Sequence, residues 1–323
     1  MALYYPCLAQ NNGGIGNDET AANLAAFEES NLKLIPVPLL KIDPVHSQFV
    51  LIADKSKQEL SLYKFDGKYH KVKTYECTTG SIKGDKAENG DLKTPEGVYF
   101  LTDLWDYKEL NRQYGKAEAA QYGMGAFNMN YPNEVDKIRN KKGYGIWLHA
   151  TNSPERIRQP YDTKGCIVIS DNDLKELTSV ISLNKTPIIV VKETKYYSSG
   201  EQEPEFEKVS QFIERWKTSW EHRDFEVFRA SYSSEFKSDN KTLSEWLDYK
   251  KLVLKGYKEI SISLSDMRIY RSDDYYLAEF HQVYHADDYR DVGTKRLYII
   301  ESEGDYEIIA EKWKAAQDKS EKQ

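Results

Sequence analysis

The chain has 323 residues, of which 40% are hydrophobic and 30% are charged, and its formal net charge is −7. This length is sufficient for two compact domains with apolar cores. The acidic balance argues against a nucleic-acid partner, because phosphate binding requires clustered Lys and Arg. The cysteines, Cys7, Cys77 and Cys166, are too few and too scattered for a disulfide framework, although two of them could still pair.

The sequence contains no stretch of the roughly 20 apolar residues that a helix needs to cross a bilayer. Its first residues, MALYYPCLAQNNGG, also lack the charged and apolar regions of a signal peptide. Two interpretations follow from these observations. Either the protein is cytoplasmic, or its export signal has been removed from this sequence.

Residues 1–45 form a mixed lead-in to a first predicted domain, 46–194. An amphipathic helix is predicted from about Asp18 to Leu34, and we expect it to pack on the main domain or on a second copy of the protein. From Gln48 onward, apolar and polar residues alternate on both sides of Asp66-Gly67, a pair of residues typical of a two-residue hairpin turn.

More strands are predicted in this domain at residues 97–101, 143–149, 165–169 and 186–191. Between the last two, Ser170 is a predicted helix N-cap, and Leu174, Leu177 and Ile181 follow at helical spacing. The first domain is therefore predicted to be rich in β-strands, with short helices.

Residues 195–206 are rich in Ser, Gly, Pro and acidic side chains, a composition that predicts a linker. A second domain is predicted at 207–316, followed by a tail at 317–323. It begins with an amphipathic helix whose apolar residues are Val209, Phe212, Ile213, Trp216 and Trp220. A second helix is predicted at 243–257 and strands at 275–285 and 296–313, which together indicate an α+β domain.

This order of helices and strands resembles the NTF2-like fold, in which a curved sheet wraps over helices and leaves a cone-shaped pocket. Candidate residues for lining such a pocket are His281, His285, Tyr276 and Tyr284. Aromatic residues at this spacing are also typical of a core, so both interpretations stay open. A glycan or another small ligand is the kind of partner that this pocket would take.

One histidine and one cysteine in the first domain form a candidate catalytic pair. His149 ends one apolar run and Cys166 begins another, and the loop between them could bring both to neighbouring strand ends. Taken separately, each residue also has a structural interpretation, as a small buried thiol and as a hydrogen-bonded histidine. A zinc site is excluded, because two ligands are fewer than zinc requires.

Gly165 strengthens the catalytic interpretation of the pair. A glycine before Cys166 permits a sharp turn, so that backbone amides can point toward a reacting carbonyl. A cysteine attacks as the thiolate, and a neighbouring imidazole can accept its proton and deliver one to a leaving amine. These residue types fit an acyl-transfer site.

At these residues the chain resembles the L,D-transpeptidase (YkuD-like) catalytic domain, whose motif is a histidine followed, after a loop, by Ser or Thr, any residue, Gly and Cys. Here the motif reads His149 and then Thr163-Lys164-Gly165-Cys166. Upstream segments that are also similar to the family are Gly80, Gly90-Asp91, Thr94-Pro95-Glu96-Gly97 and residues 129–133. The predicted fold class is therefore α+β, with a β-rich L,D-transpeptidase-like domain followed by an NTF2-like domain.

The resemblance implies a role for each motif residue. Cys166 would be the nucleophile, His149 the general base and acid, and the amides of Gly165 and Cys166 the oxyanion donors. Thr163 would hold the loop, and Lys164 would attract a substrate carboxylate or be merely solvated. Other predicted neighbours of the substrate are Trp147, for which a core position is the alternative, and Ala150, Thr151 and Tyr131. The family needs neither a metal nor an organic cofactor.

The sequence departs from the family at one position. Many members have an arginine two residues after the cysteine, where this chain has Val168. An arginine there would suit bidentate contact with a carboxylate or would support the loop. Its absence puts cross-linking activity in doubt.

The combination of both domains resembles the cell-shape-determining L,D-carboxypeptidases of helical Gram-negative bacteria. This implies a periplasmic enzyme that removes the terminal D-alanine from peptidoglycan stem tetrapeptides through a cysteine acyl-enzyme, leaving tripeptides. The N-terminal segment would join two subunits into a homodimer. The alternatives are an L,D-transpeptidase and a wall-binding or glycan-binding protein with a vestigial site.

Overall fold

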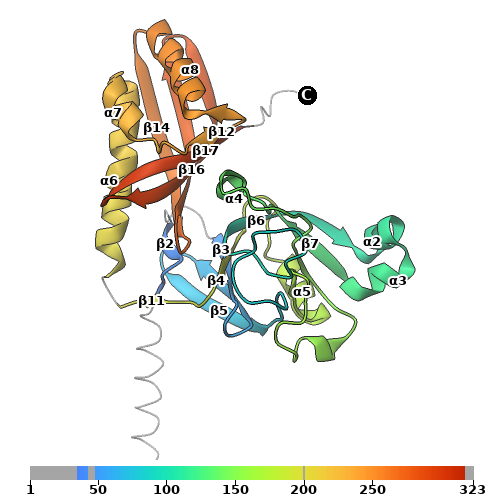
Figure 1. Ribbon diagram of the computed structural model, residues 1–323. Coiled ribbons are helices and arrows are strands. Elements are labelled where there is room, and N and C mark those ends of the chain that lie inside the picture. The colour runs from blue at the N-terminus through green and yellow to red at the C-terminus, as the bar shows by residue number, and fades with distance from the viewer. Residues whose placement is uncertain (1–34, 43–47, 199–200, 317–323) are drawn as a thin grey trace, which may run out of the picture.

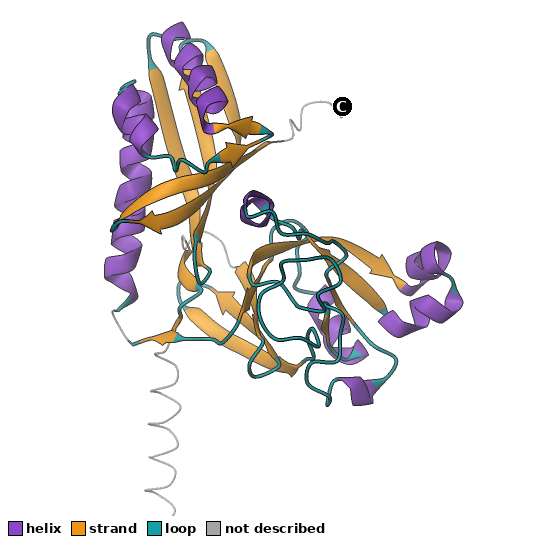
Figure 2. Ribbon diagram, in the orientation of Figure 1, coloured by secondary structure: helices purple, strands orange, loops and turns teal. Residues whose placement is uncertain are grey.

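A computed structural model describes residues 35–42, 48–198 and 201–316 (Figure 1). The helix predicted from Asp18 to Leu34, the dimerisation segment and the tail at 317–323 therefore lie outside the described residues, apart from 35–42. The structure has a strand-rich first domain and a second domain in which helices pack on an antiparallel sheet (Figure 2). This arrangement confirms the predicted α+β fold class.

In the described part of the chain, eight strands form the sheet of the first domain, in the order β5-β4-β3-β10-β6-β7-β8-β9. Their bounds are Gln48–Asp54 (β3), Glu59–Phe65 (β4), Tyr69–Glu76 (β5), Gly97–Asp106 (β6), Gly125–Met129 (β7), Trp147–His149 (β8), Ile167–Val168 (β9) and Pro187–Val191 (β10). Neighbours are antiparallel, except that β10 runs parallel to β3 and β9 runs parallel to β8.

The strands predicted in this domain are confirmed. The alternating residues after Gln48 form β3, β4 and β5, and Gly67 has the positive φ of +99° that the turn between β4 and β5 requires. Ser170 caps the helix α5, Asp171–Thr178, because its hydroxyl accepts a hydrogen bond of 3.1 Å from the backbone N–H of Asp173.

Short helices complete the first domain. They are α2 (Tyr107–Tyr114), α3 (Lys116–Ala119), α4 (Glu134–Ile138) and the 3₁₀ turns η1 (Ala120–Tyr122) and η2 (Pro154–Arg156). The sequence analysis predicted none of α2, α3 and η1, which form an excursion between β6 and β7 at the outer end of the domain (Figure 1). Asp106 begins this excursion by accepting a hydrogen bond of 2.8 Å from the backbone N–H of Glu109.

The second domain combines helices with an antiparallel sheet. The helices are α6 (Gln202–Glu221), α7 (Phe225–Ala230) and α8 (Leu243–Gly256), beside the short strands β12 (Lys237–Ser238) and β13 (Lys241–Thr242). Among the described residues, the sheet has the order β17-β16-β15-β14-β2, with bounds Asp305–Ala315, Tyr289–Ser302, Tyr276–Ala286, Ile260–Arg271 and Leu39–Ile42. The amphipathic helix predicted from Val209 to Trp220 is confirmed, because all five of its apolar residues are buried in the core of this domain.

The boundary between the domains differs from the predicted linker at 195–206. Tyr196–Tyr197 forms β11 and pairs with β1, Ile35–Pro36, while α6 already begins at Gln202. Pro204 is compatible with the first helical turn, where a missing N–H breaks no hydrogen bond. Residues 39–42 of the predicted lead-in likewise form β2 at the edge of the second sheet, paired with β14. The N-terminal segment is therefore part of both domains.

The two domains share a buried apolar interface. The phenol oxygen of Tyr275 lies inside it, and accepts hydrogen bonds from the backbone N–H of Val98 at 2.7 Å and from the Asn133 amide at 2.9 Å. The buried residues of this cluster are Val50, Ile52, Tyr63, Phe65, Val98, Phe100, Val135, Ile189 and Val191 of the first domain, with Leu39, Tyr270, Tyr275, Leu277, Tyr298, Ile309 and Ala310. Because each domain covers apolar surface of the other, the domains form one packed unit.

None of the helices in the described part of the chain combines the length and the apolar character needed to span a bilayer.

Candidate active site

The parallel pairing of β8 with β9 brings His149 and Cys166 together. Leu148 lies opposite Ile167 and His149 opposite Val168, so Cys166, directly before β9, is level with Trp147. Because side chains alternate along a strand, His149, Trp147 and Cys166 share one face of the sheet. The fold therefore places His149 and Cys166 at neighbouring strand ends, on one face of the sheet.

His149 is held by its own backbone neighbour. Its Nδ1 atom lies 2.6 Å from the carbonyl oxygen of Ala150, and its side chain is buried, with 4% of the residue exposed. A carbonyl oxygen only accepts, so Nδ1 carries the hydrogen and Nε2 of the neutral ring is left free to act as a base. The ring of Tyr122 packs edge-on against the imidazole, with 4.9 Å between ring centroids.

Burial shifts the pKa of both candidate catalytic groups toward the neutral form. It lowers the pKa of His149 to about 4, an effect to which the positive charge of Arg156 adds and which the Ala150 carbonyl opposes. Burial raises the pKa of the Cys166 thiol to about 11, although a hydrogen bond from the backbone N–H of Trp147 lowers it in part. Near neutral pH the free site therefore holds a thiol and a neutral imidazole rather than an ion pair.

The thiol is oriented toward a backbone carbonyl in this structure. The Sγ atom of Cys166 donates to the carbonyl oxygen of Gly145 at a distance of 3.6 Å. Transfer of its proton to His149 requires the thiol hydrogen to leave this carbonyl by rotation about the Cβ–Sγ bond.

Thr163 fixes the loop that precedes Cys166. Its hydroxyl accepts a hydrogen bond of 3.0 Å from the N–H of Gly165 and donates one of 2.7 Å to the carbonyl of Cys166. The prediction that Thr163 holds the loop fits this geometry. The prediction that the Gly165 amide serves as an oxyanion donor does not, because the Thr163 hydroxyl already occupies that N–H.

Gly165 is needed for its conformation. Its φ is +130°, and a Cβ atom at this position would lie 2.8 Å from the carbonyl oxygen of Lys93. The segment after β5 lies against the same loop through isolated bridges from Thr78 to Val168 and from Gly80 to Thr163. This explains why the sequence motif around Gly80 accompanies the His149 and Cys166 motif. Val168, at the position where relatives have arginine, is completely buried.

A groove of about 550 Å³ opens beside the catalytic cysteine. It reaches Cys166 through Gly145 and Trp147, and it contains Tyr131, as predicted for a neighbour of the substrate. Other aromatic side chains in its lining are Trp105, Tyr114 and Tyr144. Ring contacts then continue from Tyr114 through Trp147 and Tyr122 to His149. Aromatic side chains thus connect the lining of the groove with the ring of His149.

Of three other predicted substrate neighbours, two are buried and one is exposed. Ala150 and Thr151 are buried, with 0% and 3% of each residue exposed, because the chain turns inward after β8. Ala150 contributes its backbone carbonyl instead, and the Thr151 hydroxyl accepts from the backbone N–H of Ser153. Lys164 is exposed. The sequence analysis missed Tyr122 and Arg156, which approach the pair from η1 and η2 and belong to no motif.

The candidate pocket of the second domain is only partly as predicted. Tyr276 and Tyr284 belong to the core on the helix side of β15. His281 and His285 have the opposite parity and therefore lie on the other face of the sheet, so the prediction that they line the interior was wrong.

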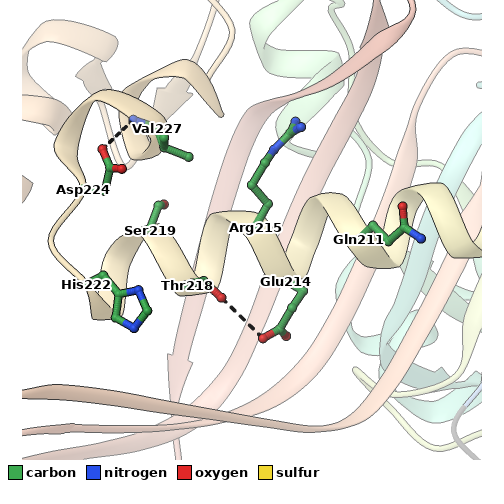
Figure 3. Close-up of a pocket in the computed structure, with 8 residues that line it drawn as sticks. All are labelled: Gln211, Glu214, Arg215, Thr218, Ser219, His222, Asp224 and Val227. Carbon is green, nitrogen blue, oxygen red and sulfur yellow. Dashed lines mark hydrogen bonds between the residues drawn. The ribbon is translucent and has the colours of Figure 1, made fainter.

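A smaller hollow of about 370 Å³ lies along α6 and the start of α7 (Figure 3). Its hydrogen bonds are local ones, such as that from the Thr218 hydroxyl to Glu214 at 3.5 Å. Across residues 35–42, 48–198 and 201–316, no three His, Cys, Asp or Glu side chains converge in a way that could hold a metal ion.

Comparisons with known proteins agree with this geometry. The family profile of the L,D-transpeptidase catalytic domain (YkuD) matches residues 48–190, and that of the Cds6 C-terminal NTF2-like domain matches residues 208–312. No curated protein sequence matches the chain.

Two solved structures are similar over most of their length. Bd1075 of Bdellovibrio bacteriovorus is 32% identical, with 88% of this chain and 100% of that chain covered and a TM-score of 0.75. The helical cell shape determining protein Pgp2 of Campylobacter jejuni is 26% identical, with 90% and 97% covered and a TM-score of 0.68. The chain therefore belongs to the L,D-transpeptidase (YkuD) family of peptidoglycan-acting enzymes, among the members that also have a C-terminal NTF2-like domain.

Proposed function

We propose that this protein is a peptidoglycan L,D-carboxypeptidase that removes the terminal D-alanine from stem tetrapeptides and leaves tripeptides. The main support is the pair of Cys166 and His149 on one face of the sheet, near a groove whose lining includes Trp147, the residue level with Cys166. The groove provides room for the stem peptide, and the pair provides a nucleophile with its base.

In the acylation step, Nε2 of His149 accepts the thiol proton while Sγ of Cys166 attacks the carbonyl carbon of the diamino acid. The Ala150 carbonyl stabilises the imidazolium through Nδ1–H. The imidazolium then protonates the amine of D-alanine as the amide bond breaks. This leaves a thioester on Cys166, free D-alanine and a neutral imidazole.

In the second step, His149 accepts a proton from water as the water oxygen attacks the thioester. The thiolate leaves and regains its proton from the imidazolium, so the tripeptide is released and the resting pair is restored. The amide of Cys166 stays a predicted oxyanion donor. A transpeptidase would differ in this step alone, because an amine of a second stem peptide would replace water.

The cell biology of the proposal follows from the relatives. Pgp2 of Campylobacter jejuni is a helical cell shape determining protein. We propose that this chain likewise influences cell shape by trimming stem peptides in the periplasm. The two alternatives are an L,D-transpeptidase that forms cross-links or exchanges D-amino acids, and a wall-binding protein with a vestigial site.

Incubation of the purified protein with disaccharide-tetrapeptide, followed by mass spectrometry, tests the proposal. We expect loss of one alanine residue as disaccharide-tripeptide accumulates, and no change with the Cys166→Ala variant. Cross-linked dimers or exchanged D-amino acids with little tripeptide would favour the transpeptidase. No reaction with any acceptor would favour the vestigial site.

A second ligand site is proposed in the C-terminal domain. Its interior buries the side chains of Lys250, Lys295 and Glu311; Lys295 is paired with Glu311, and burial lowers the pKa of Lys250 to about 7. Lys250 lies 3.8 Å from the ring centroid of Trp220 and 4.6 Å from that of Trp246. Aromatic rings beside a buried cation suit a glycan or a small ligand with an acidic group. Chemical-shift changes on adding disaccharide-tripeptide, absent in Lys250→Met, would support this site.

A further inference from the structure

Arg156 lies in the loop that connects the two catalytic strands. It ends η2, which follows His149 in the chain, and two hydrogen bonds orient its guanidinium. Nε donates to the Asp162 carboxylate at 2.8 Å, and Nη2 donates to the Asp162 backbone carbonyl at 3.2 Å. The Arg156 side chain is 28% exposed. It is therefore a positioned cation that a ligand can still reach.

Asp162 ties this guanidinium to the catalytic loop. The backbone N–H of Asp162 donates to the Thr78 hydroxyl at 2.9 Å, and the next residue is Thr163, which fixes the backbone at Cys166. Arg156 and Cys166 thus share one hydrogen-bonded loop. The guanidinium is close enough to act electrostatically on both catalytic groups, and it lowers the pKa of His149 and of Cys166.

Two other cations near the site, Lys86 and Lys137, are paired with carboxylates, whereas Lys164, two residues before Cys166, is exposed. Lys86 also acts on Cys166, but its side chain is 3% exposed and its ammonium is paired with Asp91 at 2.7 Å. Lys137 lines the groove and is paired with Glu134 at 3.0 Å. Val168 is buried and has no charge to offer. Within the described residues, Arg156 is the cation that acts on both members of the pair while staying partly exposed.

The chemistry of the proposed substrate requires such a cation. In a tetrapeptide, the terminal carboxylate is attached to the carbon that bears the scissile nitrogen, so it must lie near Cys166 and His149 during attack. The groove is lined by residues of β6, α2, β7, β8 and residues 130–145, and its lining includes no residue of the loop of Arg156. Arg has five N–H donors, and Asp162 uses two of them.

Building on the proposed function, we infer that Arg156, oriented by Asp162, binds the terminal carboxylate of the stem peptide and so selects peptides with a free C-terminus. The contact is a charge-assisted hydrogen bond. A peptide whose terminal carboxyl is amidated or joined to another residue lacks this carboxylate beside the scissile bond. We therefore expect the protein to prefer uncross-linked tetrapeptides.

The test is calorimetric binding in the Cys166→Ala background, which removes turnover from the measurement. The ligands are the disaccharide-tetrapeptide and the same compound with a C-terminal carboxamide. We expect the parent to bind the acid about 10- to 100-fold more tightly than the amide. Adding Arg156→Gln should bring this ratio close to one, and Arg156→Lys should restore part of it.

The matched control is Arg158→Gln, which removes the same charge from an exposed residue of the same loop. It should leave the ratio of acid to amide affinity unchanged. A purely structural role of Arg156 would weaken both ligands equally and preserve the ratio, which would overturn the inference. A parent that does not distinguish acid from amide would overturn it as well.

The proposed function is tested separately, by identifying the products of the native enzyme. If the native enzyme yields cross-linked products while Arg156→Gln still abolishes the preference for the acid, the carboxylate contact stands and the carboxypeptidase proposal fails. If tripeptide accumulates but Arg156→Gln does not change the ratio of acid to amide affinity, the carboxypeptidase proposal stands and the carboxylate contact fails.

Discussion

Two pairs of buried ionisable side chains, one in each domain, respond to burial in opposite ways. In the first domain, His149 and Cys166 have no buried counter-charge, and burial shifts the pKa of each group toward its neutral form. In the second domain, Lys295 and Glu311 are 4% and 1% exposed and lie 2.5 Å apart, and Lys295 lowers the pKa of Glu311 despite its burial. Burial without a partner thus gives a reactive neutral pair, whereas burial with a partner gives a stable ion pair.

The largest expected effect comes from removing the carboxylate of the buried ion pair between Lys295 and Glu311. Glu311→Leu leaves the Lys295 ammonium buried without its carboxylate, and also removes the acceptor of the Tyr232 hydroxyl at 2.5 Å. We expect the free energy of unfolding to fall by about 3–5 kcal/mol in urea titrations. The double variant Lys295→Met/Glu311→Leu should regain most of this loss. A single variant as stable as the native protein would contradict the ion-pair interpretation.

At the site of His149 and Cys166, the largest effect among residues that take no part in the chemistry should come from Thr163, which fixes the loop. Thr163→Val removes both hydrogen bonds of the hydroxyl, and we expect kcat on disaccharide-tetrapeptide to fall about 10²-fold. Thr163→Ser keeps the hydroxyl and should retain most of the activity. Equal losses in the two variants would show that packing of the methyl group, rather than hydrogen bonding, is what matters.

The interface between the two domains should show a smaller effect on stability. Tyr275→Phe removes the oxygen that accepts from Val98 and Asn133, so two buried donors lose their partner. We expect a loss of about 1–3 kcal/mol in the free energy of unfolding. Tyr249→Phe changes an exposed tyrosine of the second domain and should have little effect. Equal values for the two variants would contradict an interface that depends on the Tyr275 hydroxyl.

The pH dependence of activity, stability and alkylation tests whether burial controls the pKa values of His149 and Cys166. Because burial lowers the pKa of His149 to about 4, its imidazole stays a competent base well below pH 6.5. The acid limb of kcat/KM should fall near pH 4, and stability should decrease as pH falls from about 6.5, because the unfolded chain binds the proton first. Alkylation of Cys166 should keep accelerating above pH 9, since its pKa is raised to about 11. A decrease in kcat/KM with a midpoint near pH 6.5 would contradict the interpretation that burial lowers the pKa of His149.

Local patterns predicted much of this structure. Alternation after Gln48, the cap at Ser170 and the helical spacing from Val209 each depend on neighbours in the chain, and each prediction is confirmed. The prediction that His149 and Cys166 lie at neighbouring strand ends is also confirmed. A single loop connects the two strands, which pair in parallel.

The predictions that failed concern contacts between segments that are far apart in the sequence or that belong to no motif. The lead-in was not predicted to supply β2, because its partner β14 is more than two hundred residues away in the chain. The amide of Gly165 was predicted to be free, and only the structure shows the Thr163 hydroxyl on it. Tyr122 and Arg156 belong to no motif and reach His149 through the fold.

The most direct test of the central claim is to run the reaction in water enriched in heavy oxygen. If the neutral pair of Cys166 and His149 forms a thioester that water resolves, the tripeptide should contain the heavy oxygen in its newly formed carboxylate, and the released alanine should contain none. The label should appear with the native protein and be absent with Cys166→Ala and strongly reduced with His149→Ala. Unlabelled cross-linked dimers as the main product, or labelled tripeptide from the Cys166→Ala variant, would contradict the claim.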